Sequence, residues 1–309
     1  MMRLIITGGA GSLGSNIIEH LGDRCEDILV IDNFATGKAA ALLPRDNLRV
    51  VEGTVEDEAF LGREFARFLP THVIHSAASY KDPNDWVRDA SVNVIGTINV
   101  VRAAERAGAV RLVNFQTALC YGRPSTIPIP VDHPTQPFTS YGISKAAGED
   151  YVRTSSVPWV SLRLANVTGP RLAIGPIPTF YKRLKAGEGC SVSTTVRDFL
   201  DLSDFLSLID SILESPVQGT FNVSTGEGHT IQEIFETVAA YLGLTGAKPQ
   251  AVNEPSADDV AAVVLDPSLT ESTFGWRARV GFDETLERML RWYDENGVTD
   301  IYSHLLEKK

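Results

Sequence analysis

The feature that most constrains the fold is a regular alternation of strand-like runs with segments of helical periodicity. Between the strand-like runs, residues 57–68 and 85–107 carry apolar side chains at helical spacing. This alternation is typical of a parallel sheet covered by helices on both faces, because each parallel connection needs a crossover. We therefore predict an α/β, Rossmann-type fold with a doubly wound parallel sheet. The strand-like runs are residues 4–7, 28–31, 48–51, 72–75, 112–115 and 157–162.

After Arg163 the alternation weakens, because proline residues interrupt the chain and shorter elements follow. The last predicted element is a helix over residues 283–293. We expect a smaller C-terminal, substrate-binding lobe in this part of the chain. The predicted Rossmann domain comprises residues 1–165 and about 197–224, and the lobe comprises about 166–196 and 225–309.

Charge and cysteine content exclude several classes of function. The 28 Lys and Arg residues stand against 39 Asp and Glu, a formal net charge of -11. Such a charge repels phosphate backbones and anionic lipid, so we expect neither nucleic acid nor a membrane as partner. Cys25, Cys120 and Cys190 are widely spaced and form no CxxC pair. We therefore expect no disulfide framework, no metal site and a cytoplasmic location.

A glycine-rich turn follows the first strand-like run, where residues 7–14 read TGGAGSLG. Gly8, Gly11 and Gly14 permit a tight turn, let the backbone approach a pyrophosphate, and allow the next helix to pack against the sheet. Asp32 ends the second strand-like run. A carboxylate there accepts hydrogen bonds from a ribose diol and repels a 2'-phosphate, so NAD is favoured over NADP. The alternative is a tight turn that binds no ligand.

Tyr141 and Lys145 lie four residues apart, on one face of a helix expected over residues 138–153. A phenol with a pKa of ~10 is a poor base at neutral pH, but a nearby cation favours the phenolate. A Tyr and a Lys at this spacing are most often a solvated helix face, so a third group is needed. Thr117 supplies it just past the fifth strand-like run, at the sheet edge where doubly wound folds bind ligands.

These motifs together resemble the extended short-chain dehydrogenase/reductases, in particular the NAD-dependent nucleotide-sugar epimerases and dehydratases. The resemblance runs nearly end to end. Its carriers are Gly8, Gly11 and Gly14, Asp32-Asn33, His75-Ser76-Ala77-Ala78, Asn93, Thr117 with Tyr121-Gly122, Tyr141-x-x-x-Lys145, Arg163-x-x-Asn166 with Gly169-Pro170-Arg171, and Arg197-Asp198-Phe199.

The resemblance implies that Thr117, Tyr141 and Lys145 are catalytic, that the cofactor is NAD and that the substrate is a nucleotide sugar. It also implies a homodimer, formed through the helices at 85–107 and 138–153. The residues expected to bind NAD are Gly8, Gly11, Ser12, Leu13, Gly14, Asp32, Asn33, Thr36, Gly37, Thr54, Val55, Ala77, Ala78, Tyr80, Asn93, Tyr141 and Lys145. Those expected to bind the substrate are Lys81, Thr117, Asn166, Arg171 and Arg197.

Two positions after the expected catalytic hydroxyl bear on the reaction. Dehydratases of the family carry an Asp-Glu pair there, whereas this chain has Ala118 and Leu119, which cannot transfer a proton. The resemblance therefore implies C4 epimerisation of a UDP-hexose or UDP-hexuronate through a 4-keto intermediate, with Tyr141 as acid and base. The alternatives are a nucleotide-sugar 4-reductase, an atypical dehydratase and, outside enzymes, an NAD-sensing regulator.

Two other positions depart from the family pattern. Thr54 stands in the turn after the third strand, where family members often have Asp near the adenine. Ser256 stands where the family has an arginine that clamps the diphosphate. Either Arg171 or another cation compensates for this arginine, or the substrate differs from a standard UDP-hexose.

Two polar residues in or near these motifs have simpler structural interpretations. His75 ends a strand, and we interpret it as a satisfied structural residue rather than a catalyst. Cys120 follows the catalytic stretch without a neighbour in sequence that would lower its pKa, and we interpret it as part of the core.

Overall fold

The computed structural model describes residues 2–254 and 259–299 of the 309-residue chain. The described residues divide into two compact units. The first comprises the residues up to Cys120, Thr135–Arg163 and Leu208–Phe221, and the second comprises Tyr121–Pro134, Leu164–Ser207 and the described residues from Asn222 onward.

The first unit contains a large sheet and its covering helices. Its strands are β1 (Met2–Thr7), β2 (Cys25–Asp32), β3 (Leu48–Glu52), β4 (His72–His75), β5 (Arg111–Thr117) and β6 (Trp159–Leu164), and β11 (Gly219–Val223) joins the same sheet. Its helices are α1 (Ser12–Leu21), α2 (Glu58–Phe68), α3 (Trp86–Asp89), α4 (Thr97–Ala107) and α5 (Ser140–Arg153), with the short turns η1 (Gly22–Arg24), η2 (Ala39–Ala41) and η4 (Ala118–Tyr121) and the π-helix η3 (Ala90–Gly96).

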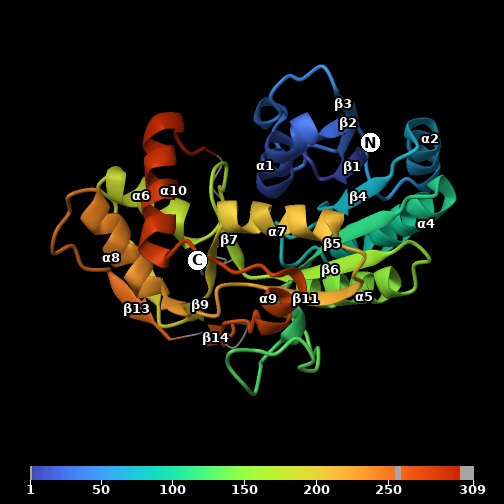
Figure 1. Cartoon of the computed structure of the whole chain (residues 1–309). Coiled ribbons are helices and arrows are strands. Elements are labelled where there is room, and N and C mark those ends of the chain that lie inside the picture. Colours follow the sequence, from blue (N-terminus) through green and yellow to red (C-terminus); the bar gives the residue numbers. More distant parts are fainter. Residues whose placement is uncertain (1, 255–258, 300–309) are drawn as a thin grey trace. The chain divides into compact units, whose positions relative to one another are not determined.

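The sheet has the strand order β11-β6-β5-β4-β1-β2-β3 (Figure 1). The neighbouring pairs from β3 through β2, β1 and β4 to β5 are all parallel. The strand order reverses between β1 and β4, and doubly wound folds bind ligands beyond the carboxyl ends of the strands at such a point. The predicted Rossmann-type α/β fold is confirmed.

Helices α2 and α4 cover one face of this sheet. Phe65 of α2 and Val100 of α4 share a buried cluster with Ile5 of β1. Leu4 and Ile6 are also fully buried, although they point to the opposite face of β1. Burial on both faces explains why the strands read as continuous apolar runs.

Arg111, at the start of β5, ties the end of α7 (Leu202–Glu214) to the sheet. Its guanidinium donates to the carbonyl oxygens of Ile212 at 2.9 Å and Val217 at 2.7 Å, and also to that of Ser215. The last carbonyls of a helix lack partners within the helix, and a cation is favoured at that end. This buried arginine therefore satisfies acceptors that would otherwise be left without hydrogen bonds.

The second unit combines helices with short strand pairs. Its helices are α6 (Pro176–Lys185), α8 (Ile231–Tyr241), α9 (Ser268–Phe274) and α10 (Phe282–Asn296), together with the start of α7. Its strands are β7 (Asn166–Thr168), β8 (Ser191–Ser193), β9 (Val196–Arg197), β10 (Phe199–Asp201), β12 (His229–Thr230), β13 (Ala251–Asn253) and β14 (Ala262–Val263). They form a β10-β7 pair, a β13-β8 pair and a three-stranded β12-β9-β14 sheet.

A buried cluster joins α6, α8 and α10. Phe180 of α6 meets Phe235 of α8 edge to face, with ring centroids 5.7 Å apart. Leu286 and Met289 of α10 belong to the same cluster and are fully buried. The apolar stripes of these three helices therefore form a core of their own within the second unit.

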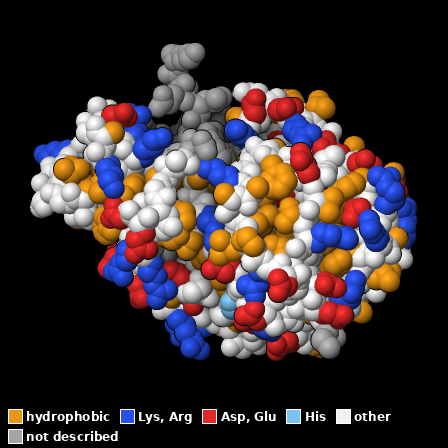
Figure 2. Space-filling view, turned by 90° about the horizontal axis from the view of Figure 1, so that it is seen from above, with side chains coloured by type: hydrophobic (Ala, Val, Ile, Leu, Met, Phe, Trp, Pro, Cys, Tyr) orange, Lys and Arg blue, Asp and Glu red, His pale blue; other side chains and the backbone are white. Residues whose placement is uncertain are grey.

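The surface of the described residues is mixed in charge. Figure 2 shows acidic and basic side chains interspersed with hydrophobic ones over the visible face. Among the described residues, no helix combines the length and the apolar character that a bilayer crossing requires.

His75 links three elements inside the first unit, which confirms its interpretation as a structural residue. Its Nδ1 lies 2.7 Å from Thr7 Oγ1 and its Nε2 lies 2.9 Å from Thr97 Oγ1. The Thr97 hydroxyl donates to the Asn93 carbonyl oxygen, so it accepts the proton on His75 Nε2. His75 Nδ1 then accepts from Thr7, and the imidazole is neutral. Burial, together with the charge of Lys145, lowers the pKa of His75 to about 3.

This neutral histidine predicts a specific loss of stability in acid. The unfolded chain binds a proton at His75 below pH ~6.5, whereas the folded chain does so only near its pKa of about 3. Stability therefore falls as the pH drops through this window, by about 1.4 kcal/mol per pH unit. We expect His75→Gln to remove this slope in urea unfolding followed by circular dichroism at pH 6, 5 and 4.

Thr97→Val, which keeps the imidazole, should lower stability but retain the slope. Equal slopes for the wild type and His75→Gln would contradict the assignment.

Candidate active site

The glycine-rich turn between β1 and α1 is closely packed at the carboxyl end of β1. Gly8 has a φ of +70°, and a Cβ on it would lie 2.6 Å from the backbone nitrogen of Ala77. A Cβ on Gly14 would lie 2.6 Å from Gly9 Cα. Both contacts are with backbone, so larger residues cannot be accommodated. Within the described chain, no side chain caps the N-terminus of α1, and its first turn offers backbone N–H groups to an anion.

Asp32 joins this turn to the loop that follows β2. Its Oδ2 accepts a hydrogen bond from the Ala10 N–H at 2.9 Å, and its Oδ1 accepts one from the Phe34 N–H at 2.8 Å. A Cβ on Gly37 would lie 2.8 Å from the carbonyl carbon of Ala10, so the loop lies directly on the turn. Each carboxylate oxygen has further lone pairs that can accept from a ribose diol. The turn and this carboxylate therefore fit the diphosphate and the adenosine ribose of a dinucleotide.

The other residues predicted to bind NAD lie mainly in segments that follow the strands of the first unit. Thr54 takes the position where the family often has Asp, and its hydroxyl donates to Glu56 Oε2 at 2.7 Å. Asn33 accepts from the Ala35 N–H at 3.1 Å. Gly11, Ser12, Leu13 and Gly14 lie at the start of α1, Asn33, Thr36 and Gly37 follow β2, Thr54 and Val55 follow β3, Ala77, Ala78 and Tyr80 follow β4, and Asn93 lies in η3.

Thr117, Tyr141 and Lys145 are brought together at the carboxyl end of β5. Thr117 is the last residue of β5, and the other two lie on the first turns of α5. Helix α5 begins where the Thr139 side chain accepts from the Gly142 N–H at 3.1 Å. The side chains of Thr117 and Tyr141 are hydrogen-bonded, and Lys145 is only 4% exposed. The predicted catalytic residues therefore lie together, with Lys145 buried and Thr117 and Tyr141 partly buried.

The electrostatics of this pair differ from the sequence-based expectation that Lys145 lowers the pKa of the phenol. Burial raises the pKa of Tyr141, Tyr80 and Asp89 raise it further, and the hydrogen bond with Thr117 lowers it. Burial lowers the pKa of Lys145 to about 8, against the opposing effect of Glu149. The reason is desolvation, which disfavours the charged form of each group and outweighs the other contributions.

Two buried side-chain amides join the chain segments that form this site. Gln116 Nε2 donates to the carbonyl oxygen of Lys145 at 2.7 Å, and its Oε1 accepts from the Thr117 N–H at 2.7 Å. Asn93 Nδ2 donates to the Ser79 carbonyl oxygen at 2.9 Å and to Ser144 Oγ at 3.0 Å, and its Oδ1 accepts from the Ser79 N–H at 2.8 Å. The π-helix η3, which carries Asn93, thus joins the loop after β4 to α5.

A buried ion pair involves the residue one helical turn beyond Lys145 on the same face of α5. Glu149, one turn beyond Lys145, accepts from Ser161 Oγ at 2.7 Å and forms a 2.7 Å ion pair with Arg163. Both partners of this ion pair are buried. Glu149 therefore places a fixed negative charge beside the lysine and favours its ammonium form.

The predicted substrate-binding residues are divided between the units. Lys81 and Thr117 lie in the first unit, and Lys81 is exposed. In the second unit, Asn166 Nδ2 donates to the Asp198 carbonyl oxygen at 2.9 Å. Arg171 has a φ of +68°, a left-handed conformation uncommon outside glycine. Ser256 lies outside the described residues.

The guanidinium of Arg197, in the second unit, makes three polar contacts through its two terminal nitrogens. Its Nη1 donates to the carbonyl oxygens of Val196 and Val260, each at 2.8 Å, and its Nη2 lies 2.6 Å from Asp259 Oδ1. Burial lowers the pKa of Arg197, and Asp259 raises it. Five N–H groups are available on a guanidinium, so these three contacts fix its plane without using every donor.

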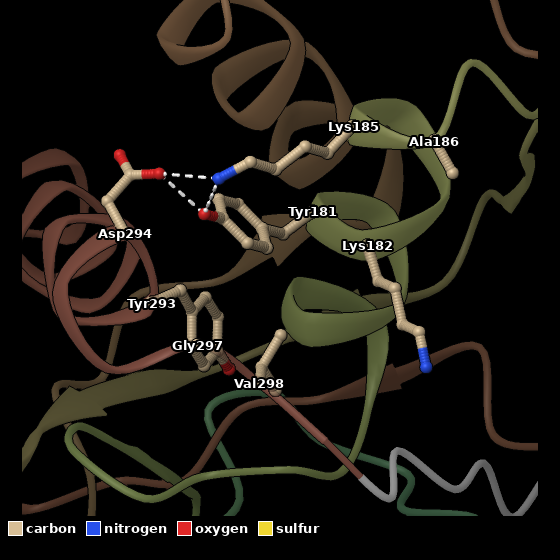
Figure 3. Close-up of a pocket in the computed structure, with 8 residues that line it drawn as sticks. All are labelled: Tyr181, Lys182, Lys185, Ala186, Tyr293, Asp294, Gly297 and Val298. Carbon is tan, nitrogen blue, oxygen red and sulfur yellow. Dashed lines mark hydrogen bonds and ion pairs between the residues drawn. The ribbon is translucent and has the colours of Figure 1, made fainter.

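A hollow of about 400 Å³ in the second unit contains a second Tyr-x-x-x-Lys pair, Tyr181 and Lys185 of α6 (Figure 3). Lys185 Nζ lies 2.6 Å from Tyr181 Oη and 2.9 Å from Asp294 Oδ1, and its side chain is 55% exposed. The hydrogen bonds to Tyr181 and Lys185 help to lower the pKa of Asp294 to about 2. In the described part of the chain, none of the predicted site residues lines this hollow, whose lining is Tyr181, Lys182, Lys185, Ala186, Tyr293, Asp294, Gly297 and Val298.

Sequence reasoning missed Gln116, Glu149 and Asp259. Glu149 carried a detectable signal, because it lies four residues after Lys145 on the same helix face. Gln116 directly precedes Thr117, but the sequence does not show which way its side chain points. Asp259 carries no comparable signal, since its contact with Arg197 joins residues 62 positions apart.

Comparisons with known proteins identify a family and solved structures that this chain resembles. The model of the NAD dependent epimerase/dehydratase family matches residues 4–224. The crystal structure of the Bordetella bronchiseptica enzyme WbmG in complex with NAD has 64% identity and a TM-score of 0.93, covering 98% of this chain and 97% of that chain. A structure of WbmG with NAD and UDP has 63% identity, the same TM-score and the same coverage. The UDP-glucose 4-epimerase of Corynebacterium glutamicum is 30% identical, over 89% of this chain and 90% of that protein.

The family match spans the glycine turn, Asp32, Thr117, Tyr141 and Lys145. It also includes Arg197, which lies in the second unit. The chain therefore belongs to the NAD dependent epimerase/dehydratase family, whose cofactor is NAD.

Proposed function

We propose that this protein is an NAD-dependent 4-epimerase of a UDP-hexose or UDP-hexuronate. The observation that carries the proposal is the grouping of the partly buried Thr117 and Tyr141 with the buried Lys145, beside Ala118 and Leu119. One acid/base residue suffices for epimerisation, whereas the family's dehydratases carry an added Asp-Glu pair at the two apolar positions. The UDP-glucose 4-epimerase relative and the UDP complex of WbmG support this choice of reaction and nucleotide.

In this proposal the glycine turn and Asp32 hold the cofactor, for the steric and hydrogen-bonding reasons given above. Bound by these residues, NAD would supply reversible hydride transfer at C4 of the sugar. Tyr141 removes the proton of the sugar 4-hydroxyl and later gives it back. Thr117 hydrogen-bonds the reacting oxygens, and the Lys145 ammonium stabilises the phenolate. Because burial raises the pKa of Tyr141, its neutral phenol is well suited to the proton-donating step.

The substrate's diphosphate is assigned to Asn166, Arg171 and Arg197. A guanidinium already oriented by Asp259 loses less side-chain entropy when it binds two phosphate oxygens. Arg171 is our candidate for the cation that replaces the family arginine at Ser256.

The alternatives are a 4-reductase, an atypical dehydratase and an NAD-sensing regulator. The two enzymes would give a reduced or a dehydrated product, and the regulator would give none. The cytoplasmic location stays a prediction.

The homodimer is also part of the proposal. Trp86 of α3 and Ile143 of α5 are large apolar side chains with 70% and 52% exposure, and Ile95 of η3 and Tyr151 of α5 are also exposed. These elements pack against one another within the first unit. Apolar side chains gathered on adjoining helices are typical of a surface that a second copy covers.

Replacing the phenol tests the central assignment. We expect Tyr141→Phe to reduce conversion of UDP-glucose to UDP-galactose on the order of 10³-fold, because the acid/base group is lost. Conversion without added cofactor is measured by NMR, with thermal unfolding as the check on folding. The matched control is Tyr181→Phe, which alters the second Tyr-x-x-x-Lys pair, on α6, and should retain full activity. Near-wild-type turnover by Tyr141→Phe would refute the mechanism, and a reduced or dehydrated product would identify one of the alternatives.

The buried ammonium predicts the alkaline limit of activity. Lys145 has a pKa lowered to about 8, so its charge is lost as the pH rises through that value. The turnover number should therefore decline above pH 8, as measured between pH 6 and 10. The residual activity of Lys145→Arg should lack this decline, since guanidinium stays charged. Wild-type turnover that is constant up to pH 9.5 would count against the role of the ammonium.

The proposed dimer surface can be tested by inserting a charge. We expect the wild type to have the mass of two chains by light scattering after gel filtration. Ile143→Glu should give a single-chain mass, because a carboxylate would be buried without a partner. Val110→Glu alters another exposed apolar residue and should leave the dimer intact. A single-chain mass for the wild type at micromolar concentration would refute the dimer.

A further inference from the structure

Asp89 is a buried carboxylate that the proposed mechanism does not use. It ends α3 and is 1% exposed. Its Oδ2 accepts a hydrogen bond from Ser140 Oγ at 2.7 Å. Its Oδ1 is buried and has no hydrogen-bond partner within the described chain. Burying a carboxylate oxygen without a partner costs stability, so its presence needs an explanation.

The position of Asp89 links it to the catalytic phenol. Ser140 is the first residue of α5 and directly precedes Tyr141. The N-terminus of a helix favours a negative charge, which offsets part of the cost of burying Asp89 there. The hydrogen bond to Ser140 also anchors the first turn of α5, on which the phenol is carried.

The groups facing Tyr141 come from several elements. Tyr80 follows β4 and packs edge to face on the Tyr141 ring, with centroids 6.1 Å apart. Thr117 faces it from β5 and Cys120 from η4, and Lys145 lies one turn along α5. Asp89 differs from these groups because its negative charge can be removed without changing a side chain assigned to the reaction. That charge opposes ionisation of Tyr141 and contributes to its raised pKa.

We propose that Asp89 is a positioning residue that anchors the start of α5 through Ser140 and places its carboxylate charge beside Tyr141. This inference rests on the proposed function, in which Tyr141 is the acid and base. Tyr141 is a base only in its ionised form, so the nearby charge of Asp89 shifts the balance between the two forms of the phenol toward the neutral one.

The test measures the pKa of Tyr141 directly in the full-length protein. Tyrosine labelled with ¹³C at Cζ is titrated by NMR, and the Tyr141 signal is assigned by its loss in Tyr141→Phe. Asp89→Asn keeps an acceptor for Ser140 but removes the charge, and should lower the pKa of Tyr141 on the order of one pH unit. The acid limb of the turnover profile should move to lower pH by the same amount. Wild type and variants are compared at the same measured NAD content.

Three further variants make the outcome decisive. Ser140→Ala removes the hydrogen bond and keeps the charge, so the pKa of Tyr141 should stay in place. Asp89→Glu restores the charge and should restore the pKa. Asp89→Ala removes the charge without burying an amide, and replaces Asp89→Asn in the titration if that variant does not fold.

An unchanged pKa in the variants that lack the charge would overturn the inference, as would equal shifts in Asp89→Asn and Ser140→Ala. A protein without epimerase activity that still shows the shift would refute the proposed function and support the role of Asp89.

Discussion

The site depends on the burial of one ammonium group against the end of a parallel sheet. Lys145 is almost completely excluded from solvent, and a charge in such a place is stable only if other charges and dipoles compensate for lost hydration. Glu149 supplies the compensating charge, and Arg163 and Ser161 hold that carboxylate in turn. Gln116 fixes the backbone of the same turn of α5 against the end of β5. Helix α5 is thus held against the end of β5 by specific polar contacts.

Two Tyr-x-x-x-Lys pairs in one chain show why environment, rather than spacing, decides chemistry. Tyr181 and Lys185 hydrogen-bond each other and share Asp294, and the lysine and the aspartate of this group are exposed. Tyr141 and Lys145 have the same spacing, but they lie at the carboxyl end of β5 in a desolvated location. Burial brings the pKa of Lys145 close to neutrality, whereas hydrogen bonds raise the pKa of Lys185. The surroundings of each pair, and not the shared spacing, therefore set the direction in which the lysine pKa moves.

The carboxylates near the candidate catalytic residues have opposite effects on them. Glu149 favours the ammonium form of Lys145, whereas Asp89 opposes ionisation of Tyr141. In the second unit, Asp259 holds the guanidinium that we assign to the diphosphate. Each carboxylate acts through a neighbouring residue, so motif matching that looks for reacting groups passes over all three. Their contributions are electrostatic and depend on distance and burial.

The sequence by itself determined the sheet and the candidate catalytic residues. The runs at 4–7, 28–31, 48–51, 72–75 and 112–115 lie within β1 to β5, and the helix predicted over 57–68 is α2. Strands buried on both faces and glycines with backbone contacts leave local patterns that can be read. Tertiary structure alone decided that residues 90–96 form a π-helix, that Asp89 lies at the start of α5, and that the phenol's pKa rises rather than falls. The physical reason is that desolvation and charge interactions depend on which residues distant in sequence surround a group, and spacing along the chain does not contain that information.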